Sequence, residues 1–120
     1  MHKLVHTIRF ESARKLTKVP KDHPCSNLYG LAFKLEIHVE GNVNPETGFV
    51  KDFSEIENYF EPLKEKLDHN YLNDIKGLEN PTSEVLIEWI WNNLKPDIRN
   101  WITKLVLWEN EVSRVEFSGN

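Results

Sequence analysis

The chain has 120 residues, of which 39% are hydrophobic and 11% aromatic, and its formal net charge is −4. This length predicts a single domain over residues 1–120, and the composition excludes an intrinsically disordered chain. The lysines and arginines form no stripe along the sequence, so neither nucleic acid nor an anionic membrane is an expected partner. A single cysteine excludes an internal disulfide, and no apolar run reaches the roughly 20 residues of a membrane span. We therefore expect a cytoplasmic protein.

The first part of the chain predicts two strands joined by a long loop. Residues 3–10 and 31–40 alternate between apolar and polar side chains, which is the two-residue period of a strand with one buried face. Residues 16–30 contain two prolines, an asparagine and a glycine, and predict a long loop of the kind that often carries function. Residues 41–50 contain turn-forming residues and predict a hairpin or a tight corner.

Two helices are predicted next. Asp52 or Ser54 can cap the first helix, whose apolar stripe extends to Leu67 and which Pro62 is expected to kink. The predicted stripe comprises Phe53, Ile56, Tyr59 or Phe60, Leu63 and Leu67.

After a polar loop over 68–81, a second helix is predicted over 82–94, where Pro96 should stop it. Two strands, over 102–109 and 112–118, complete the order ββααββ. This order predicts an α+β fold, in which a four-stranded antiparallel sheet carries both helices on one face. The two open edges of such a sheet favour oligomerisation.

Four ionisable side chains lie in loops or at strand ends and could carry chemistry: Cys25, Asp68, His69 and Glu109. Cys25 and His69 can form a thiolate–imidazole pair, with Asp68 orienting the ring. Cys25 and the Asp68-His69 pair also have purely structural explanations. A single buried cysteine is usually an inert hydrophobic residue, and an Asp-His pair in a loop is more often a cap beside a surface side chain.

Seven motifs occur in a fixed order: FESA, HPC, LYG, NPETGFVKDF, LDHNYLND, GLENPTSE and WE. From about Ile8 to Glu109, the chain resembles the 6-pyruvoyltetrahydropterin synthase family, in particular its 6-carboxytetrahydropterin synthases. Those enzymes are lyases in the route to 7-deazaguanines such as queuosine. The resemblance implies a T-fold whose subunits join edge to edge as trimers, with two trimers usually stacked as a hexamer. Active sites would then lie between subunits, so one site can draw Cys25 and Glu109 from different chains.

The resemblance also implies catalytic roles, position by position. Cys25 matches the family's catalytic thiolate, which abstracts a proton from the substrate side chain. Asp68 and His69 match the partner pair that performs acid–base work.

Three further residues are implied in ligand binding. Glu109 matches the carboxylate that anchors the pterin, and a carboxylate can accept two parallel N–H bonds from the edge of a 2-aminopyrimidinone ring. Thr82 and Ser83 would lie near that ring. Both are also residue types that begin a helix, which explains them without any ligand.

At three positions the chain departs from the family's pattern. The resemblance implies a zinc ion bound by one histidine of F-E-A-A-H-R and two of L-H-G-H, whereas this chain has Arg14, Tyr29 and Leu31 there. Arginine stays protonated and leucine offers no lone pair, so we expect neither zinc nor another cofactor. Arg14 is expected either to face a phosphate or carboxylate of the ligand, or to pair with a nearby carboxylate such as Glu11.

Three interpretations follow. The favoured one is an enzyme that acts on a pterin-like substrate through Cys25, Asp68 and His69 without zinc. Because zinc as a Lewis acid typically lowers the barrier by several kcal/mol, the parent activity is expected to be lost or altered. The second is a non-catalytic pterin or deazapurine binder, such as a regulator or a partner of an active paralogue. The third is an engineered zinc-site variant of the synthase.

Overall fold

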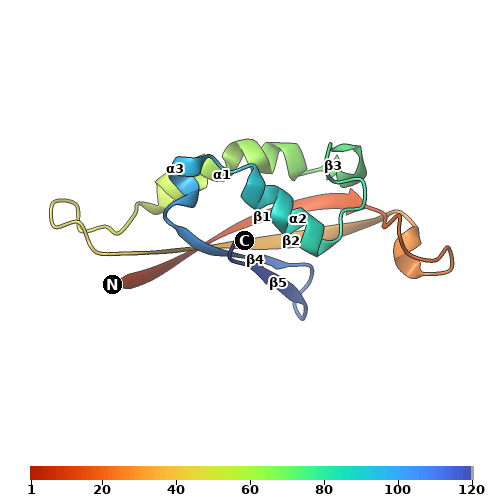
Figure 1. Cartoon of the computed structure of the whole chain (residues 1–120), viewed down its shortest axis with the longest axis horizontal. Helices are drawn as coiled ribbons and strands as arrows, with labels where there is room; N and C mark the ends of the chain where they lie inside the picture. The colour runs from red at the N-terminus through yellow and green to blue at the C-terminus, as the bar shows by residue number, and fades with distance from the viewer. Residues whose placement is uncertain (120) are drawn as a thin grey trace.

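Two long strands form the centre of the structure, a computed structural model that describes residues 1–119 (Figure 1). Strand β1 (His2–Arg14) and strand β2 (Tyr29–Gly41) pair antiparallel along their whole length, with His2 opposite Gly41 and Arg14 opposite Tyr29. Both are longer than their alternating patterns predicted. In such a pair, directly opposed residues lie on the same face, so the register decides which side chains can meet.

The sheet has five strands in the order β3-β1-β2-β4-β5. Strands β4 (Ile102–Trp108) and β5 (Arg114–Phe117) form the predicted C-terminal antiparallel pair. The sequence did not predict β3 (Asn70–Tyr71), which runs parallel to β1 beside Ser12 and Ala13. The predicted four-stranded antiparallel sheet is thus extended by one short parallel strand, because the chain leaving the first helix runs along the edge of β1.

Three helices lie on one face of the sheet (Figure 1): α1 (Phe53–Leu67), α2 (Ser83–Asn92) and the short α3 (Pro96–Arg99). The predicted α+β architecture is confirmed. Asp52 caps α1 by accepting a hydrogen bond from the backbone N–H of Ser54 at 2.9 Å. Pro62 lies inside α1, which continues to Leu67. Pro96 begins α3, a position where the missing N–H of proline costs nothing. Two 3-10 turns, Pro24–Ser26 and Leu72–Asp74, complete the elements.

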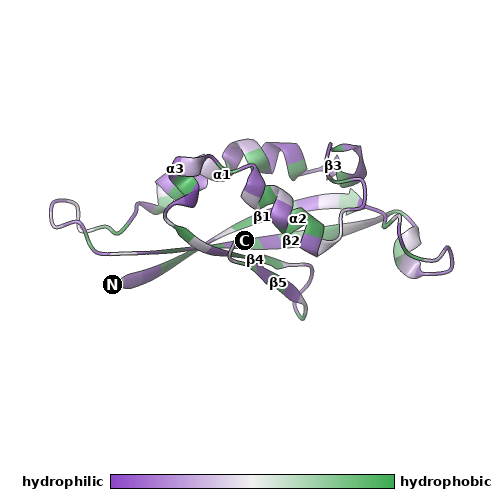
Figure 2. Ribbon diagram, viewed as in Figure 1, coloured by the Kyte–Doolittle hydropathy of each residue, from purple (hydrophilic) through white to green (hydrophobic). Residues whose placement is uncertain are grey.

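The hydrophobic core fills the space between the sheet and the helices (Figure 2). The helices contribute Ile56, Phe60, Leu63 and Leu67 from α1, and Leu86, Ile87 and Ile90 from α2. Two aromatic residues expected on the stripe of α1 are not in this core: Phe53 is 48% exposed and Tyr59 is 36% exposed. They contact side chains at its rim instead, because Phe53 stacks on His6 and Tyr59 packs against Trp101.

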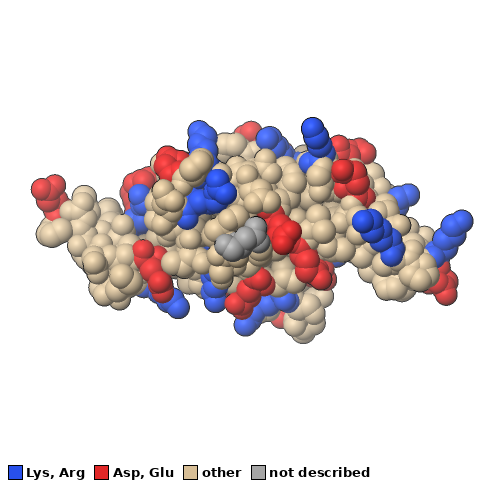
Figure 3. Space-filling model, in the orientation of Figure 1, with Lys and Arg blue, Asp and Glu red and all other residues tan. Residues whose placement is uncertain are grey.

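The surface shown in Figure 3 carries acidic and basic side chains side by side. On this face, positive charge does not gather into a continuous patch. Within residues 1–119, no helix has both the length and the apolar character needed to cross a membrane.

Candidate functional site

Asp68 and His69 lie where α1 meets strand β1. Asp68 is the C-terminal cap of α1, and its Oδ1 accepts a hydrogen bond from the backbone N–H of Glu11 at 2.8 Å. The backbone N–H of His69 in turn donates to the carbonyl oxygen of Glu11. Nδ1 of His69 lies 3.1 Å from Asp68 Oδ1. The Glu11 amide is the main cause that lowers the pKa of Asp68, and His69 adds to it. The pair is therefore held by the backbone of β1.

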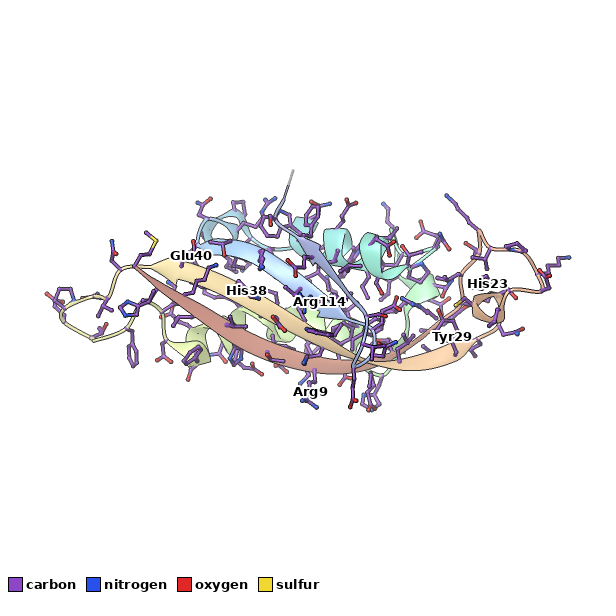
Figure 4. The ribbon with its side chains drawn as sticks, turned by 90° about the horizontal axis from the view of Figure 1, so that it is seen from below. Arg9, His23, Tyr29, His38, Glu40 and Arg114 are labelled. Atoms are coloured by element: carbon purple, nitrogen blue, oxygen red, sulfur yellow. The ribbon has the colours of Figure 1, made fainter. Side chains whose placement is uncertain are left out.

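An open cavity of about 790 Å³ runs past this pair, and its size suits a small-molecule ligand. Strands β1, β2 and the end of β4 form its remaining walls. Figure 4 shows Arg9 and Tyr29 on the two strands that form part of its lining. The side chains that bear on its chemistry are Arg9, Tyr29, Leu31, Lys34, Asp68, His69, Trp108 and Glu109. Cys25 is not among the residues that line it in this chain.

Glu109 follows directly after β4 and is held by two donors. Its Oε1 accepts a hydrogen bond from Nη2 of Arg14 at 2.9 Å and another from the hydroxyl of Ser83. Burial raises the pKa of Glu109, but the bonds from Ser83 and Arg14, together with the charge of Arg14, outweigh it and lower the pKa. A side-chain exposure of 31% leaves this carboxylate accessible from the cavity. It is thus an ionised acceptor at the cavity wall.

Arg14 is buried, with only 3% of its surface exposed. The guanidinium group donates to the hydroxyl of Tyr29 at 2.9 Å, to the carbonyl oxygen of Pro81 at 3.0 Å and to the hydroxyl of Ser83 at 3.3 Å, in addition to Glu109. Burial lowers the pKa of Arg14, but the bonds to Glu109 and Tyr29 more than offset this and raise it. Arg14 thus pairs with a carboxylate, which was one of the two expectations, but the partner is Glu109 and not Glu11. Glu11 lies an odd number of residues away on the same strand and so faces the other side of the sheet.

Thr82 and Ser83 have different roles although they are neighbours. Thr82 is the N-cap of α2, and its hydroxyl accepts a hydrogen bond from the backbone N–H of Val85 at 3.1 Å. Ser83 is 1% exposed, and its hydroxyl is directed to Glu109 and Arg14 instead. Only Ser83 is therefore part of the polar cluster that contains Glu109.

Cys25 lies in the 3-10 turn Pro24–Ser26, shortly before strand β2. Its backbone N–H donates to Nδ1 of His23 at 3.0 Å, and its carbonyl oxygen accepts from the backbone of Leu16. Figure 4 shows His23 and Tyr29 at the same end of the molecule. Burial, followed by a hydrogen bond with the Cys25 thiol, raises the pKa of Tyr29 against the opposing effect of Arg14.

The side chains at positions 14, 29 and 31 do not fit a zinc ion. The N–H groups of Arg14 are donated to protein acceptors, Leu31 has no lone pair, and the Tyr29 oxygen already accepts a hydrogen bond from Arg14. Within residues 1–119, no group of three histidine, cysteine or carboxylate side chains is arranged to hold a metal ion.

The sequence did not single out Trp108 as a site residue, although it was quoted in the WE motif. Its ring lies against the Lys34 ammonium group at 4.7 Å and the Arg114 guanidinium group at 4.9 Å, and its Nε1 donates to Glu36 at 2.7 Å. The signal for this arrangement is in the pairing of β2 with β4, where Lys34 is directly opposite Trp108. Sequence periodicity alone does not reveal that register.

Comparison with known proteins places the chain in a family. Residues 3–120 match the model of the 6-pyruvoyl tetrahydropterin synthase family. A 6-carboxy-5,6,7,8-tetrahydropterin synthase from Synechocystis is 40% identical over 91 residues, which is 72% of this chain and 69% of that protein. A 6-pyruvoyl tetrahydrobiopterin synthase from Dictyostelium discoideum is 29% identical over 99 residues, covering 79% and 73%.

The fold is also found in solved structures. The 6-pyruvoyl tetrahydropterin synthase of Caenorhabditis elegans superposes with a TM-score of 0.89 at 18% identity, covering 99% of this chain and 96% of that one. The Plasmodium falciparum enzyme superposes with a TM-score of 0.68 at 16% identity, covering 96% of each chain. The predicted T-fold is confirmed, and the chain belongs to the 6-pyruvoyl tetrahydropterin synthase family.

Proposed function

We propose that the protein binds a pterin-like ligand in the cavity and performs acid–base chemistry on it. The observation that carries this proposal is the placement of Glu109 on the same cavity as Asp68 and His69. An ionised carboxylate suits the N–H donors of a pterin ring, and the relatives of this chain are named for pterin substrates or products.

In this proposal, His69 transfers a proton at the substrate side chain. Asp68 contacts Nδ1 of the ring, and Nε2, which lies 4.0 Å from Oε2 of Glu11, is the atom proposed to transfer the proton. The backbone of Glu11 fixes Asp68, so the orientation of the imidazole is set by strand β1 rather than by the ligand. The exposure of His69, 76% of its side chain, allows the ring to reach a ligand in the cavity.

Cys25 is the proposed thiolate base, supplied by a neighbouring subunit. Two features support a homo-oligomer, either a trimer or a hexamer of two trimers. First, Cys25 is not among the residues that line the cavity of its own chain. Second, β3 covers β1 only at Ser12 and Ala13, which leaves most of the β1 edge open for pairing with another sheet.

We also propose that the reaction proceeds without zinc or another cofactor. The side chains at positions 14, 29 and 31 supply no ligand set, so every step is assigned to the chain's own residues. The zinc-assisted reaction that the resemblance implies is then altered or lost. A second candidate, a non-catalytic pterin or deazapurine binder, is favoured by this same loss of metal ligands.

A complementation experiment tests the enzyme proposal and its shared site together. Purified protein is incubated with dihydroneopterin triphosphate and other dihydropterins, and products are followed by mass spectrometry. We expect turnover by the wild type, loss of turnover in Cys25→Ala and in Glu109→Gln, and partial recovery when the two variants are unfolded and refolded together. Recovery requires that one site takes Cys25 and Glu109 from different chains. Failure to recover would overturn the shared site.

The same experiment separates the enzyme from the binder. If the wild type binds pterin but converts no dihydropterin, the protein is a binder. If purified wild type holds one zinc per chain by elemental analysis, the zinc-free proposal is wrong. Cys25→Ala is matched by Ser26→Ala, since Ser26 lies in the same 3-10 turn and its hydroxyl bonds only to nearby backbone carbonyls. Turnover by Ser26→Ala shows that the loss in Cys25→Ala is due to the thiol and not to the turn.

A further inference from the structure

Arg14 is the buried cation that joins four parts of the fold around Glu109. It comes from the end of β1 and bonds to Tyr29 at the start of β2, to Pro81 and Ser83 at the start of α2, and to Glu109 after β4. Of all the charged side chains in residues 1–119, only Arg14 is classed as buried. A buried charge is tolerated only when it is paired and hydrogen-bonded; Arg14 pairs with Glu109, and four hydrogen bonds engage all three of its side-chain nitrogens.

Its donors are directed into the protein rather than outward. Four hydrogen bonds use Nε, Nη1 and Nη2, and the guanidinium carbon also lies 5.4 Å from the ring centre of Tyr29 and 5.6 Å from that of Phe33. To reach an anionic group of a ligand, Arg14 would have to give up these bonds in a buried site. The structure therefore favours an indirect role for Arg14, exerted through Glu109.

The two bonds to Glu109 converge on one oxygen. Oε1 accepts from both Arg14 and Ser83, which occupies both of its lone pairs. Within residues 1–119, no hydrogen bond reaches Oε2. The carboxylate is thus oriented so that Oε1 is hydrogen-bonded within the protein, while Oε2 can accept a hydrogen bond from a ligand in the cavity. A ligand would be held through Oε2, rather than through the two-oxygen contact that the sequence suggested.

We propose that Arg14 is a positioning residue, which places a positive charge beside Glu109 and turns its carboxylate so that Oε2 accepts an N–H of the ligand, while Arg14 itself does not touch the ligand. This inference rests on the proposed function, in which Glu109 binds the pterin. It also assigns a role to the position where the family's pattern has a metal ligand. Here a fixed side-chain cation organises the site in place of a bound ion.

The test uses the fluorescence of free pterin, 2-amino-4-oxopteridine, titrated with the wild type, Arg14→Lys and Arg14→Gln. Because Arg14→Gln leaves Glu109 without its charged partner and its orienting donor, we expect binding at neutral pH to weaken by about tenfold or more. Arg14→Lys keeps the positive charge but not the planar set of donors of a guanidinium group. Its affinity for pterin should therefore lie between those of the wild type and Arg14→Gln.

The decisive readout is the pH at which binding is lost, followed from neutral pH to about pH 4, near the ordinary pKa of a carboxyl. Glu109 without a neighbouring cation becomes protonated at a higher pH, so the midpoint should move upward in Arg14→Gln and stay near the wild-type value in Arg14→Lys. A merely structural role would weaken both variants without moving the midpoint. The other ionisable groups that line the cavity are unchanged in these variants: Arg9, Glu11, Tyr29, Lys34, Asp68, His69 and Glu111.

Two results would overturn the inference: wild-type affinity in Arg14→Gln, or the same midpoint in all three proteins. If the wild type does not bind pterin at all, the proposed function fails instead. The Arg14–Glu109 coupling is then measured without ligand, by urea unfolding of Arg14→Gln, Glu109→Gln and the double variant. A smaller effect of Arg14→Gln in the Glu109→Gln background upholds the coupling, and additive effects refute it.

Discussion

The hydroxyl of Ser83 donates to Oε1 of Glu109, so the first residue of helix α2 is attached to the end of strand β4. Arg14 from β1 bonds to both residues. The three side chains join two strands and a helix at one point beside the cavity. The geometry of Glu109 is therefore a property of the whole fold, and it depends on residues distant in the sequence.

Ser83→Ala and Thr82→Ala should both destabilise the protein, but in different ways. Loss of the Thr82 cap should cost about 1 kcal/mol at every pH, because only a backbone amide loses its partner. Loss of Ser83 removes a bond that lowers the pKa of Glu109. Ser83→Ala should therefore also reduce the acid-dependent part of the stability, as measured by urea unfolding at neutral and acidic pH. Equal pH profiles for the two variants would contradict the Ser83–Glu109 contact.

Glu109→Gln should make the protein less sensitive to acid. The pKa of Glu109 is lower in the folded protein than its ordinary value of 4.5, so the folded state favours the ionised form. This contribution is fully present above about pH 4.5 and is lost as the pH falls through the lowered folded-state pKa. Urea midpoints of the wild type should thus fall more steeply below that pH than those of Glu109→Gln.

Glu61→Gln is the matched control for this variant. Glu61 is an exposed residue of α1, so Glu61→Gln deletes one surface carboxylate. We expect Glu61→Gln to follow the wild-type acid profile. If Glu109→Gln and Glu61→Gln reduce the dependence of the urea midpoint on pH equally, the effect comes from general charge repulsion and not from the Arg14–Glu109 ion pair.

Tyr29 should titrate at a higher pH than an ordinary tyrosine. Burial and the Cys25 thiol raise its pKa above 10.0 despite Arg14, so the folded state holds the phenolic proton more tightly. The contribution of Tyr29 to the free energy of unfolding is present below about pH 10 and is lost as the pH rises through the folded-state pKa of Tyr29. Absorbance at 295 nm during alkaline titration follows tyrosine ionisation, and Tyr29→Phe should remove a component that titrates above pH 10. If Tyr29→Phe instead removes a component that titrates near pH 10, the surroundings of Tyr29 do not raise its pKa.

The sequence predicted the strands well because their signal is local. Alternation along residues 3–10 and 31–40 reflects one buried face, and the structure places those residues in β1 and β2. Strand β3 has only two residues, too few to show any period, and its partner Ser12 lies far away in the chain. Such a short pairing depends on the end of α1 lying beside β1, which the sequence alone does not predict.

The candidate site was predicted in its residues but not in its contacts. The motifs identified Glu109, Ser83 and Arg14, whereas the ion pair between Arg14 and Glu109 joins the first strand to the fourth. Glu11 was the nearer carboxylate in the sequence, yet the strand geometry turns it to the opposite face. Side chains 95 positions apart meet only through the sheet register and the packing of α2, neither of which has a sequence signature here.

His69 adopts a left-handed backbone conformation with φ 58°, which is costly for any residue with a Cβ atom. Glycine avoids that cost, so His69→Gly should be more stable than His69→Ala by about 1 kcal/mol in urea unfolding. Gly77→Ala is the converse control, because Gly77 has φ 94° and a Cβ there would lie 3.1 Å from Trp89; this change should destabilise. Equal stability of the two His69 variants would mean that the turn relaxes and stores no strain. If glycine is the more stable, histidine at this position is retained at a cost in stability, as expected of a side chain kept for its chemistry.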